Sequence, residues 1–384
     1  MNFQFSTAPK IVFGPDSARS IPEYAKEMGN KVCLVTGKSP QRIQWLVDAL
    51  QEKGSDLHII SISGEPDTKL IAGQVTDARA MGCDVVVAVG GGSVLDAGKA
   101  IAALIPNKRD LLDYLEVVGK GQALDEKPLP LIAAPTTSGT GSEATANAVL
   151  LSAENKVKVS LRSTDMIPDI AVVDPLLTLS APPAVTGATG LDALTQLMES
   201  FVSRFNSPMT DALCREGLRH GAKSLLKAYK DGDNVEARTD MALASLFSGI
   251  TLANAKLGAV HGFAAPLGGE FKAPHGAVCA ALLPYVMEIN IRVLKERDPQ
   301  NPALAAYTET AKILTGNNSA QAADGIEWIK DICAEMKIPG LGEIGVQEKD
   351  FKSVAAKAAR ASSMKGNPIE LTEDELLEIL EKAL

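Results

Sequence analysis

The chain has 384 residues, more than a single hydrophobic core usually supports, so we expect two domains. With 46% apolar and 22% charged residues, its composition is that of an ordinary globular protein. A net charge of −9 argues against a nucleic acid or an anionic membrane as a partner. The longest apolar run, residues 277–287, is shorter than the roughly 20 residues that cross a bilayer and predicts a buried helix.

The cysteines are odd in number and lie mostly within apolar segments. They predict reduced core thiols, and neither a disulfide framework nor a cysteine-based metal site. The opening residues lack the basic, apolar and small-residue succession of a secretory signal, so a cytoplasmic location is expected. The five residues concerned are Cys33, Cys83, Cys214, Cys279 and Cys333.

The first half of the chain alternates short apolar runs with amphipathic stretches, which is typical of strand–helix–strand units. Residues 3–5 and 10–14 predict a small edge hairpin at the start. Residues 1–181 are therefore predicted to form an α/β domain with a doubly wound parallel sheet of the Rossmann-like kind. Further strands are predicted at 31–36, 57–61, 85–89, 131–135 and 170–174, with helices between most of them, for example at 40–53 and 69–81.

Three glycines, Gly90, Gly91 and Gly92, follow the apolar run at 85–89. Ser93 stands where a helix N-cap belongs, and Ala-rich helical sequence follows it. The unpaired amides at the start of a helix favour an anion such as a diphosphate, and glycines let the backbone come close to it. A tight strand–helix turn without a ligand is the alternative.

A second loop, residues 135–143 (PTTSGTGSE), follows another apolar run and offers several hydroxyls and two more glycines. Two such loops at strand ends suit a dinucleotide better than they suit packing. Asp96 is expected to face the cofactor too, although a first-turn acid that interacts with the helix dipole explains it nearly as well. The candidate cofactor-binding residues of both loops are Gly90, Gly91, Gly92, Ser93, Asp96, Thr136, Thr137, Thr140, Ser142 and Thr145.

The turn after the predicted strand at 31–36 bears on the choice of cofactor. Enzymes that prefer NAD typically place an acid there, which accepts from the ribose 2′-hydroxyl. Here the turn reads Gly37-Lys38-Ser39 and continues to Arg42, with no carboxylate to repel a 2′-phosphate and several groups that could bind one. We therefore expect NADP(H) to be preferred, with NAD possible; a plain turn with Ser39 as a helix cap is the alternative.

From residue 182 onward the chain is rich in Ala and Leu with helical spacing, which predicts an all-helical domain at 182–384. Thr372 and Glu375 form the capping-box pattern of a last helix. A ligand held at the strand ends of the first domain would then face the helical domain across a cleft.

Two of the four histidines stand out because each precedes a glycine within apolar sequence: His261 and His275. A lone buried imidazole is costly without a partner. Upstream, Asp192 and Gln196 are four residues apart and share a helix face. One carboxylate and two imidazoles could hold a divalent ion such as Fe or Zn; two satisfied core histidines are the alternative.

These motifs, in this order and over nearly the whole length, resemble the iron-containing (group III) alcohol dehydrogenases, which share the dehydroquinate synthase-like fold. The resemblance is carried by residues 90–99 (GGGSVLDAGK), 135–143, 189–194 (TGLDAL) and 274–278 (PHGAV). It implies hydride transfer between NAD(P) and an alcohol or aldehyde, with Asp192, His261 and His275 catalytic, and homo-oligomers such as dimers. It also implies that Lys158 lies near the nicotinamide ribose, although a strand-edge lysine is as good an interpretation.

Two positions depart from the pattern of that family, in which one Asp and three His hold the metal. Gln196 stands where the third His is expected, and an amide oxygen is a weaker ligand than imidazole for borderline metals. We expect a site of reduced affinity or one completed by water. Ala265 replaces a further His thought to assist proton transfer, so a proton relay must use water, a cofactor ribose hydroxyl or a substrate group.

The expected function is thus an NAD(P)-dependent oxidoreductase that interconverts a small alcohol and an aldehyde or ketone, with a metal at Asp192, Gln196, His261 and His275. Gln196 and Ala265 leave open a metal-independent reductase of the maleylacetate reductase type. A dehydroquinate synthase-like lyase would need phosphate-binding Lys and Arg residues around His261 and His275, where the sequence is mostly apolar. A catalytically silent nucleotide-binding protein is the remaining alternative.

Overall fold

The computed structural model describes residues 2–155, 157–271 and 273–384. They form two compact units. The α/β unit comprises Ser6–Thr137 and Gly141–Thr178, and the helical unit comprises Leu179–Leu384 with Ser138–Thr140 and residues 2–5. The second loop of the sequence analysis is therefore divided, with its central three residues belonging to the helical unit.

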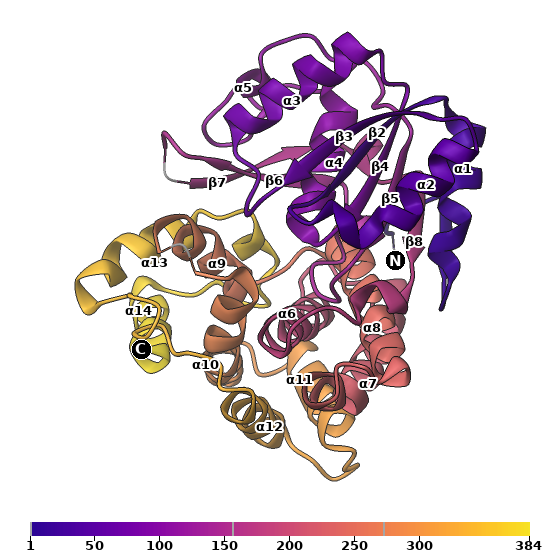
Figure 1. Ribbon diagram of the computed structural model, residues 1–384. Helices are drawn as coiled ribbons and strands as arrows, with labels where there is room; N and C mark the ends of the chain where they lie inside the picture. Colours follow the sequence, from indigo (N-terminus) through magenta and orange to yellow (C-terminus); the bar gives the residue numbers. More distant parts are fainter. Residues whose placement is uncertain (1, 156, 272) are drawn as a thin grey trace. The chain divides into compact units, whose positions relative to one another are not determined.

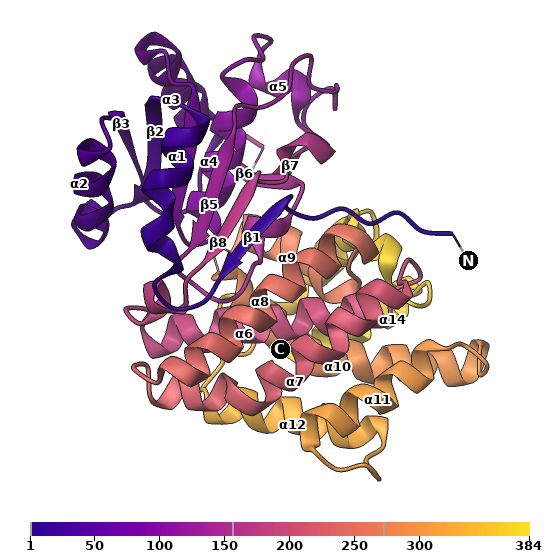
Figure 2. The ribbon, with the colours of Figure 1, turned by 90° about the vertical axis from the view of Figure 1, so that its right-hand side faces the viewer.

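The α/β unit is built on a six-stranded parallel sheet with the order β1-β8-β5-β4-β2-β3 (Figures 1 and 2). The predicted fold class is confirmed, and each of the five later predicted strands is present. The central strands are rich in β-branched residues and buried on both faces, as parallel strands covered by helices must be. The strands are β1 (Lys10–Phe13), β2 (Lys31–Gly37), β3 (Asp56–Ile62), β4 (Val85–Gly90), β5 (Leu131–Pro135) and β8 (Ile170–Val173).

The predicted opening hairpin is wrong. β1 pairs in parallel with β8, with Lys10 opposite Ile170, and the described residues before it contain no strand. β1 forms one edge of the sheet, and its partner β8 lies 160 positions further along the chain. The local sequence could not indicate a pairing over this distance. An antiparallel pair that was not predicted, β6 (Asn147–Ser152) and β7 (Val157–Arg162), follows the second loop.

Helices cover both faces of the sheet. One apolar cluster joins α1 (Ile21–Met28) and α2 (Gln44–Glu52) to the strands, and another joins α3 (Thr68–Met81) and α4 (Gly92–Leu104) to the opposite faces of the same strands. Neighbouring strands β2 and β4 thus send their helices to opposite faces. Open α/β sheets bind ligands at the carboxyl ends of two such strands. A short helix, α5 (Leu111–Tyr114), lies between β4 and β5 in the chain.

The helical unit contains nine helices among the described residues, around one apolar core (Figure 1). The predicted capping box of the last helix is present: the Thr372 hydroxyl accepts from the Glu375 amide, and the Glu375 carboxylate accepts from the Thr372 amide. The helices are α6 (Pro183–Phe201), α7 (Pro208–Lys230), α8 (Val235–Ala255), α9 (Ala259–Glu270), α10 (His275–Arg297), α11 (Ala303–Thr315), α12 (Ala322–Glu335), α13 (Phe351–Ala359) and α14 (Glu373–Ala383).

Helix α10 is longer than the apolar run predicted for it, and its composition alone would let it cross a membrane. Its most apolar window is 83% buried inside the protein. The helix packs against α6, α9, α12 and α14. Its apolar character is therefore that of a core helix.

Candidate functional site

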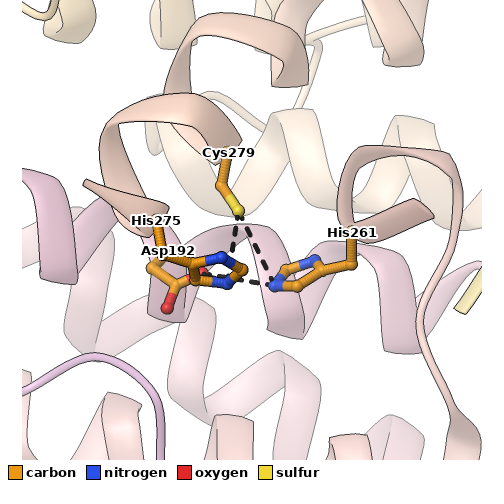
Figure 3. A group of neighbouring side chains, drawn as sticks. All are labelled: Asp192, His261, His275 and Cys279. Atoms are coloured by element: carbon orange, nitrogen blue, oxygen red, sulfur yellow. Dashed lines mark hydrogen bonds and ion pairs between the residues drawn. The ribbon is translucent and has the colours of Figure 1, made fainter. Parts of the chain in front are cut away.

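Four ligand-type side chains converge inside the helical unit (Figure 3): Asp192 from α6, His261 from α9, and His275 and Cys279 from α10. One donor atom from each lies within 4.8 Å of the other three. Asp192 Oδ1 is 3.2 Å from His261 Nε2 and 3.7 Å from His275 Nε2. Cys279 Sγ is 3.8 Å from His261 Nε2 and 3.7 Å from His275 Nε2. The folded chain thus brings together atoms from segments 87 positions apart.

Asp192 is held by its neighbour one helical turn later. The Gln196 side-chain amide donates to Asp192 Oδ2 at 3.2 Å, and Gln196 Oε1 lies 3.0 Å from the Ser248 hydroxyl, which is also 2.7 Å from the Ser245 carbonyl oxygen. Because a carboxylate oxygen only accepts, the Gln196 atom that faces it must be the NH₂ group. Asp192 Oδ1, the oxygen that faces the histidines, is buried with no hydrogen-bond partner in the described part of the chain. This oxygen is therefore available to a cation.

His261 is oriented by Glu199, a residue that the sequence analysis missed. His261 Nδ1 donates to Glu199 Oε2 at 2.6 Å, and the backbone amide of Val260 donates to Glu199 Oε1 at 2.7 Å. The buried carboxylate thus caps the start of α9 and fixes the imidazole so that Nε2 faces the cluster. A carboxylate behind a ligating histidine is common in metal sites.

The groups of the cluster strongly affect one another's pKa values. Burial alone would raise the pKa of Asp192, but His275 and His261 lower it. Burial alone would lower the pKa of His261, but Cys279, Asp192 and Glu199 raise it well above its ordinary value. The neighbouring groups thus favour protonated imidazoles in the metal-free cluster, and a bound cation would compete with those protons.

Two glycines allow the helices to come close enough for this cluster to form. A Cβ at Gly258 would lie 2.9 Å from Glu199 Oε1. A Cβ at Gly276 would lie 2.2 Å from the carbonyl oxygen of Ala188 on α6, so only glycine lets α10 bring His275 beside Asp192. Small residues next to the two histidines are thus a packing requirement of the site.

The cluster fits a divalent cation. A carboxylate oxygen without a hydrogen-bond partner, two imidazole nitrogens and a sulfur face one point, and their mutual separations leave room for an ion. The structure brings together Asp192, His261 and His275 as predicted. It places the Gln196 oxygen on Ser248, and it places Cys279 in the cluster, although the sequence analysis counted that residue as a core thiol. The i, i+4 spacing of His275 and Cys279 could have indicated this.

In the α/β unit, the glycine loop joins β4 to α4. The prediction of Ser93 as N-cap is wrong: Gly91 is the capping residue, and the helix begins at Gly92. The first amides that bond within the helix are those of Val94 and Leu95, which both donate to the Gly91 carbonyl. The second loop lies alongside, because the Thr136 amide donates to the Gly90 carbonyl at 2.9 Å. The amides that begin α4 therefore lie beside Thr136.

Behind these loops, several predicted cofactor residues bind one another. The Ser142 hydroxyl donates to Asp96 Oδ1 at 2.5 Å, and the Val149 amide donates to Asp96 Oδ2 at 3.0 Å. The buried Lys99 ammonium donates to the Thr145 hydroxyl at 2.8 Å and lies 3.2 Å from Asp96 Oδ1. These contacts brace the start of α4 against the second loop. A direct role of these residues toward a cofactor remains a prediction.

The remaining predicted residues lie apart from this network. Gly37 ends β2, and Lys38 after it is exposed. Ser39 stands at the N-cap position of the short helix Pro40–Ile43, as its alternative interpretation predicts, but its side chain makes no capping hydrogen bond. Lys158 on β7 forms an ion pair with Glu65. Thr140 belongs to the helical unit, where the neighbouring Gly139 amide donates to the Ser245 hydroxyl at 2.7 Å.

Comparison with known proteins covers almost the whole chain. The model of the family described as iron-containing alcohol dehydrogenase matches residues 8–175, and the C-terminal model of the same family matches residues 186–384. The chain is 34% identical over 384 residues to 1,3-propanediol dehydrogenase of Klebsiella pneumoniae, covering 97% of this chain and 96% of that protein.

Solved structures agree with these sequence matches. A crystal structure of 1,3-propanediol oxidoreductase superposes with a TM-score of 0.92 at 32% identity, covering 100% of both chains. Sulfoacetaldehyde reductase from Bifidobacterium kashiwanohense, solved in complex with NAD⁺, superposes with a TM-score of 0.88 at 29% identity. That match covers 100% of this chain and 99% of the other.

Proposed function

Because this chain belongs to the iron-containing alcohol dehydrogenase family, we propose that its NAD(P)-dependent interconversion of an alcohol and an aldehyde or ketone uses a divalent metal held at the Asp192 cluster. The observation that carries the proposal is Asp192 Oδ1, a buried carboxylate oxygen without a hydrogen-bond partner in the described chain, beside His261 and His275. When bound, the metal supplies a Lewis acid for the substrate oxygen.

The protein residues have separate tasks. Asp192 and the two imidazoles hold the ion, and Glu199 and Gln196 hold the orientation of His261 and Asp192. A bound nicotinamide would supply hydride transfer to or from the alcohol carbon, and the hydroxyl proton would need a separate acceptor. Ala265 on α9 has no group that can take this proton, so the acceptor would be water, a cofactor ribose hydroxyl or a substrate group.

The dinucleotide is proposed to bind across the ends of β2 and β4. The amides that begin α4 favour its diphosphate, and Thr136 and Thr137 lie beside them. Lys38 and Arg42 are exposed at the turn after β2, where no carboxylate would repel a 2′-phosphate. We therefore propose that NADP(H) is preferred over NAD(H). A small uncharged substrate, a homodimer and a cytoplasmic location complete the proposal.

Metal analysis and kinetics on the purified protein test the proposal together. Oxidation of NADPH with a panel of small aldehydes is measured before and after exhaustive chelation. We expect about one transition-metal ion per chain, loss of activity on chelation, and recovery when metal is restored. Full activity without bound metal would instead favour the metal-independent reductase. A higher kcat/KM with NADH than with NADPH would contradict the cofactor assignment.

A further inference from the structure

The thiol of Cys279 has a place in the cluster that neither the sequence pattern nor the family comparison assigns. We propose that the Cys279 thiolate, and not Gln196, is the fourth protein ligand of the metal, and that the resulting Asp–His–His–Cys set favours zinc over ferrous iron. This inference rests on the proposed function, since it needs a cation at the cluster. It adds the identity of the ligand and the class of metal.

Four of the six separations in the cluster are close to the edges of a tetrahedron. Zinc bonds of about 2.0–2.1 Å to nitrogen or oxygen and about 2.3 Å to sulfur give tetrahedral edges of about 3.6 Å between nitrogen and sulfur. The same bonds give edges of about 3.3 Å between nitrogen and oxygen. The distances from Cys279 Sγ to the two Nε2 atoms are 3.8 and 3.7 Å, and those from Asp192 Oδ1 are 3.2 and 3.7 Å.

The side chain of Gln196 already contacts groups other than a metal ion at the cluster. Its NH₂ group faces Asp192 Oδ2, and its carbonyl oxygen faces the Ser248 hydroxyl. To ligate the metal through oxygen, Gln196 would have to turn its amide and leave Asp192 Oδ2 without this donor. Cys279 needs no such rearrangement, because its sulfur already lies beside both Nε2 atoms. Gln196 is thus a positioning residue for the carboxylate.

The thiolate also brings negative charge to the cation in a buried site. A divalent cation bound by one carboxylate, one thiolate and two neutral imidazoles is formally neutral, and the buried Glu199 carboxylate behind His261 adds one negative charge. Sulfur binds a metal as the thiolate, so any proton on Cys279 passes to water when the metal binds.

A thiolate changes which ion the site selects. Soft sulfur ligands favour zinc, whereas carboxylate, carbonyl and water ligands favour harder ions. A tetrahedral protein site can still accept a substrate oxygen by expanding to five ligands. The His275 side chain is 36% exposed, while the other three members are buried, so a substrate would approach from the side of His275.

Cobalt(II) titrated into metal-free protein tests the ligand directly, because a thiolate bound to cobalt gives a near-ultraviolet charge-transfer absorption that oxygen and nitrogen ligands do not. We expect this absorption in the wild type and in Gln196→Ala. Cys279→Ser should lose it and should weaken zinc binding, measured by competition with a chelator, by more than about 100-fold, which exceeds the usual effect of changing a residue behind a ligand. The ratio of zinc to ferrous-iron affinity, measured without oxygen, should also fall in this variant.

Cys333→Ser is the matched control, since Cys333 is a half-buried thiol on α12 of the same unit and is not a member of the cluster. It should keep the absorption and the affinity. Cobalt bound by the wild type without the charge-transfer absorption would overturn the role of Cys279 and leave the proposed metal function standing. Failure of the wild type to bind cobalt or zinc at all would overturn both. If Cys279→Ser does not fold, the wild-type, Gln196→Ala and Cys333→Ser spectra still decide the question.

Discussion

Two clusters of polar groups, one in each unit, differ in how their charges are satisfied. In the α/β unit, Asp96 accepts hydrogen bonds through both oxygens and Lys99 has two partners. In the helical unit, Asp192 Oδ1 has no hydrogen-bond partner in the described chain and faces two imidazoles and a thiol. Buried polar groups are normally satisfied within the protein. A satisfied cluster therefore braces the fold, whereas a buried carboxylate oxygen without a hydrogen bond, beside three metal-binding side chains, indicates a ligand.

The largest effect should separate the two carboxylates. Asp192→Asn keeps the size of the side chain but removes the charge that a cation needs, so we expect loss of the bound metal. The kcat/KM should fall by about 1000-fold, because metal polarisation supplies several kcal/mol of transition-state stabilisation. Asp96→Asn is the control: it should lower the melting temperature while metal content stays at the wild-type level. Loss of metal in Asp96→Asn would break the distinction drawn here.

The next effect concerns the turn after β2. Lys38→Glu should lower kcat/KM for NADPH by about 10- to 100-fold, since a charge-assisted hydrogen bond to a phosphate contributes about 1.5–3 kcal/mol. The value for NADH should change much less, because NADH lacks the 2′-phosphate. Lys127→Glu changes an exposed lysine elsewhere in the same unit and should alter neither value. Equal losses with both cofactors would place Lys38 away from the 2′-phosphate.

Gly90 and Gly91 are neighbours, but substituting them should have different effects, on stability at Gly90 and on dinucleotide binding at Gly91. A Cβ at Gly90 would lie 2.5 Å from the Cβ of Val94, so Gly90→Ala should lower the free energy of unfolding by about 1–3 kcal/mol. A Cβ at Gly91 would meet Thr137 Oγ1 at an ordinary 3.5 Å. Gly91→Ala should therefore fold normally but crowd the diphosphate, raising the Kd of the dinucleotide by about tenfold, or 1.4 kcal/mol. Denaturant unfolding and dinucleotide titration measure the two effects, and an unchanged Kd for Gly91→Ala would argue against a diphosphate at this loop.

The last effect concerns the exception in the α/β unit. Glu143 is buried, and neither carboxylate oxygen has a hydrogen-bond partner among the described residues. Burial raises the pKa of Glu143 from 4.5 to about 7, although the nearby Lys99 lowers it somewhat. Between these two values the folded state binds more protons than the unfolded state. Stability therefore decreases as the pH rises, by at most about 3 kcal/mol.

Glu143→Gln resembles the protonated acid and should abolish this decrease. Melting temperatures of the variant and the wild type, compared at about pH 5 and pH 8, measure it, since the linkage operates between the two pKa values. The variant should gain stability at the higher pH and little at the lower one. An equal difference at both values would show that Glu143 does not titrate in this range.

The local motifs of this chain were readable without a structure. The parallel sheet follows from apolar runs that alternate with amphipathic helices, and the glycine loop after β4 follows from a run of residues. Asp192, His261 and His275 could be identified because each lies in a short pattern of its own. These signals depend on neighbours within a few positions, which is the range over which backbone conformation and helix faces are determined.

Only the tertiary structure decided which groups complete the site. Glu199 reaches His261 across 62 positions, and α10 approaches α6 because Gly276 has no side chain. Cys279 becomes a candidate ligand through that packing. The Gln196 oxygen faces Ser248, 52 positions away, and does not face the metal cluster. The edge pairing of β1 with β8 has the same origin. Such contacts depend on how whole elements pack, and a sequence pattern carries no direct record of them.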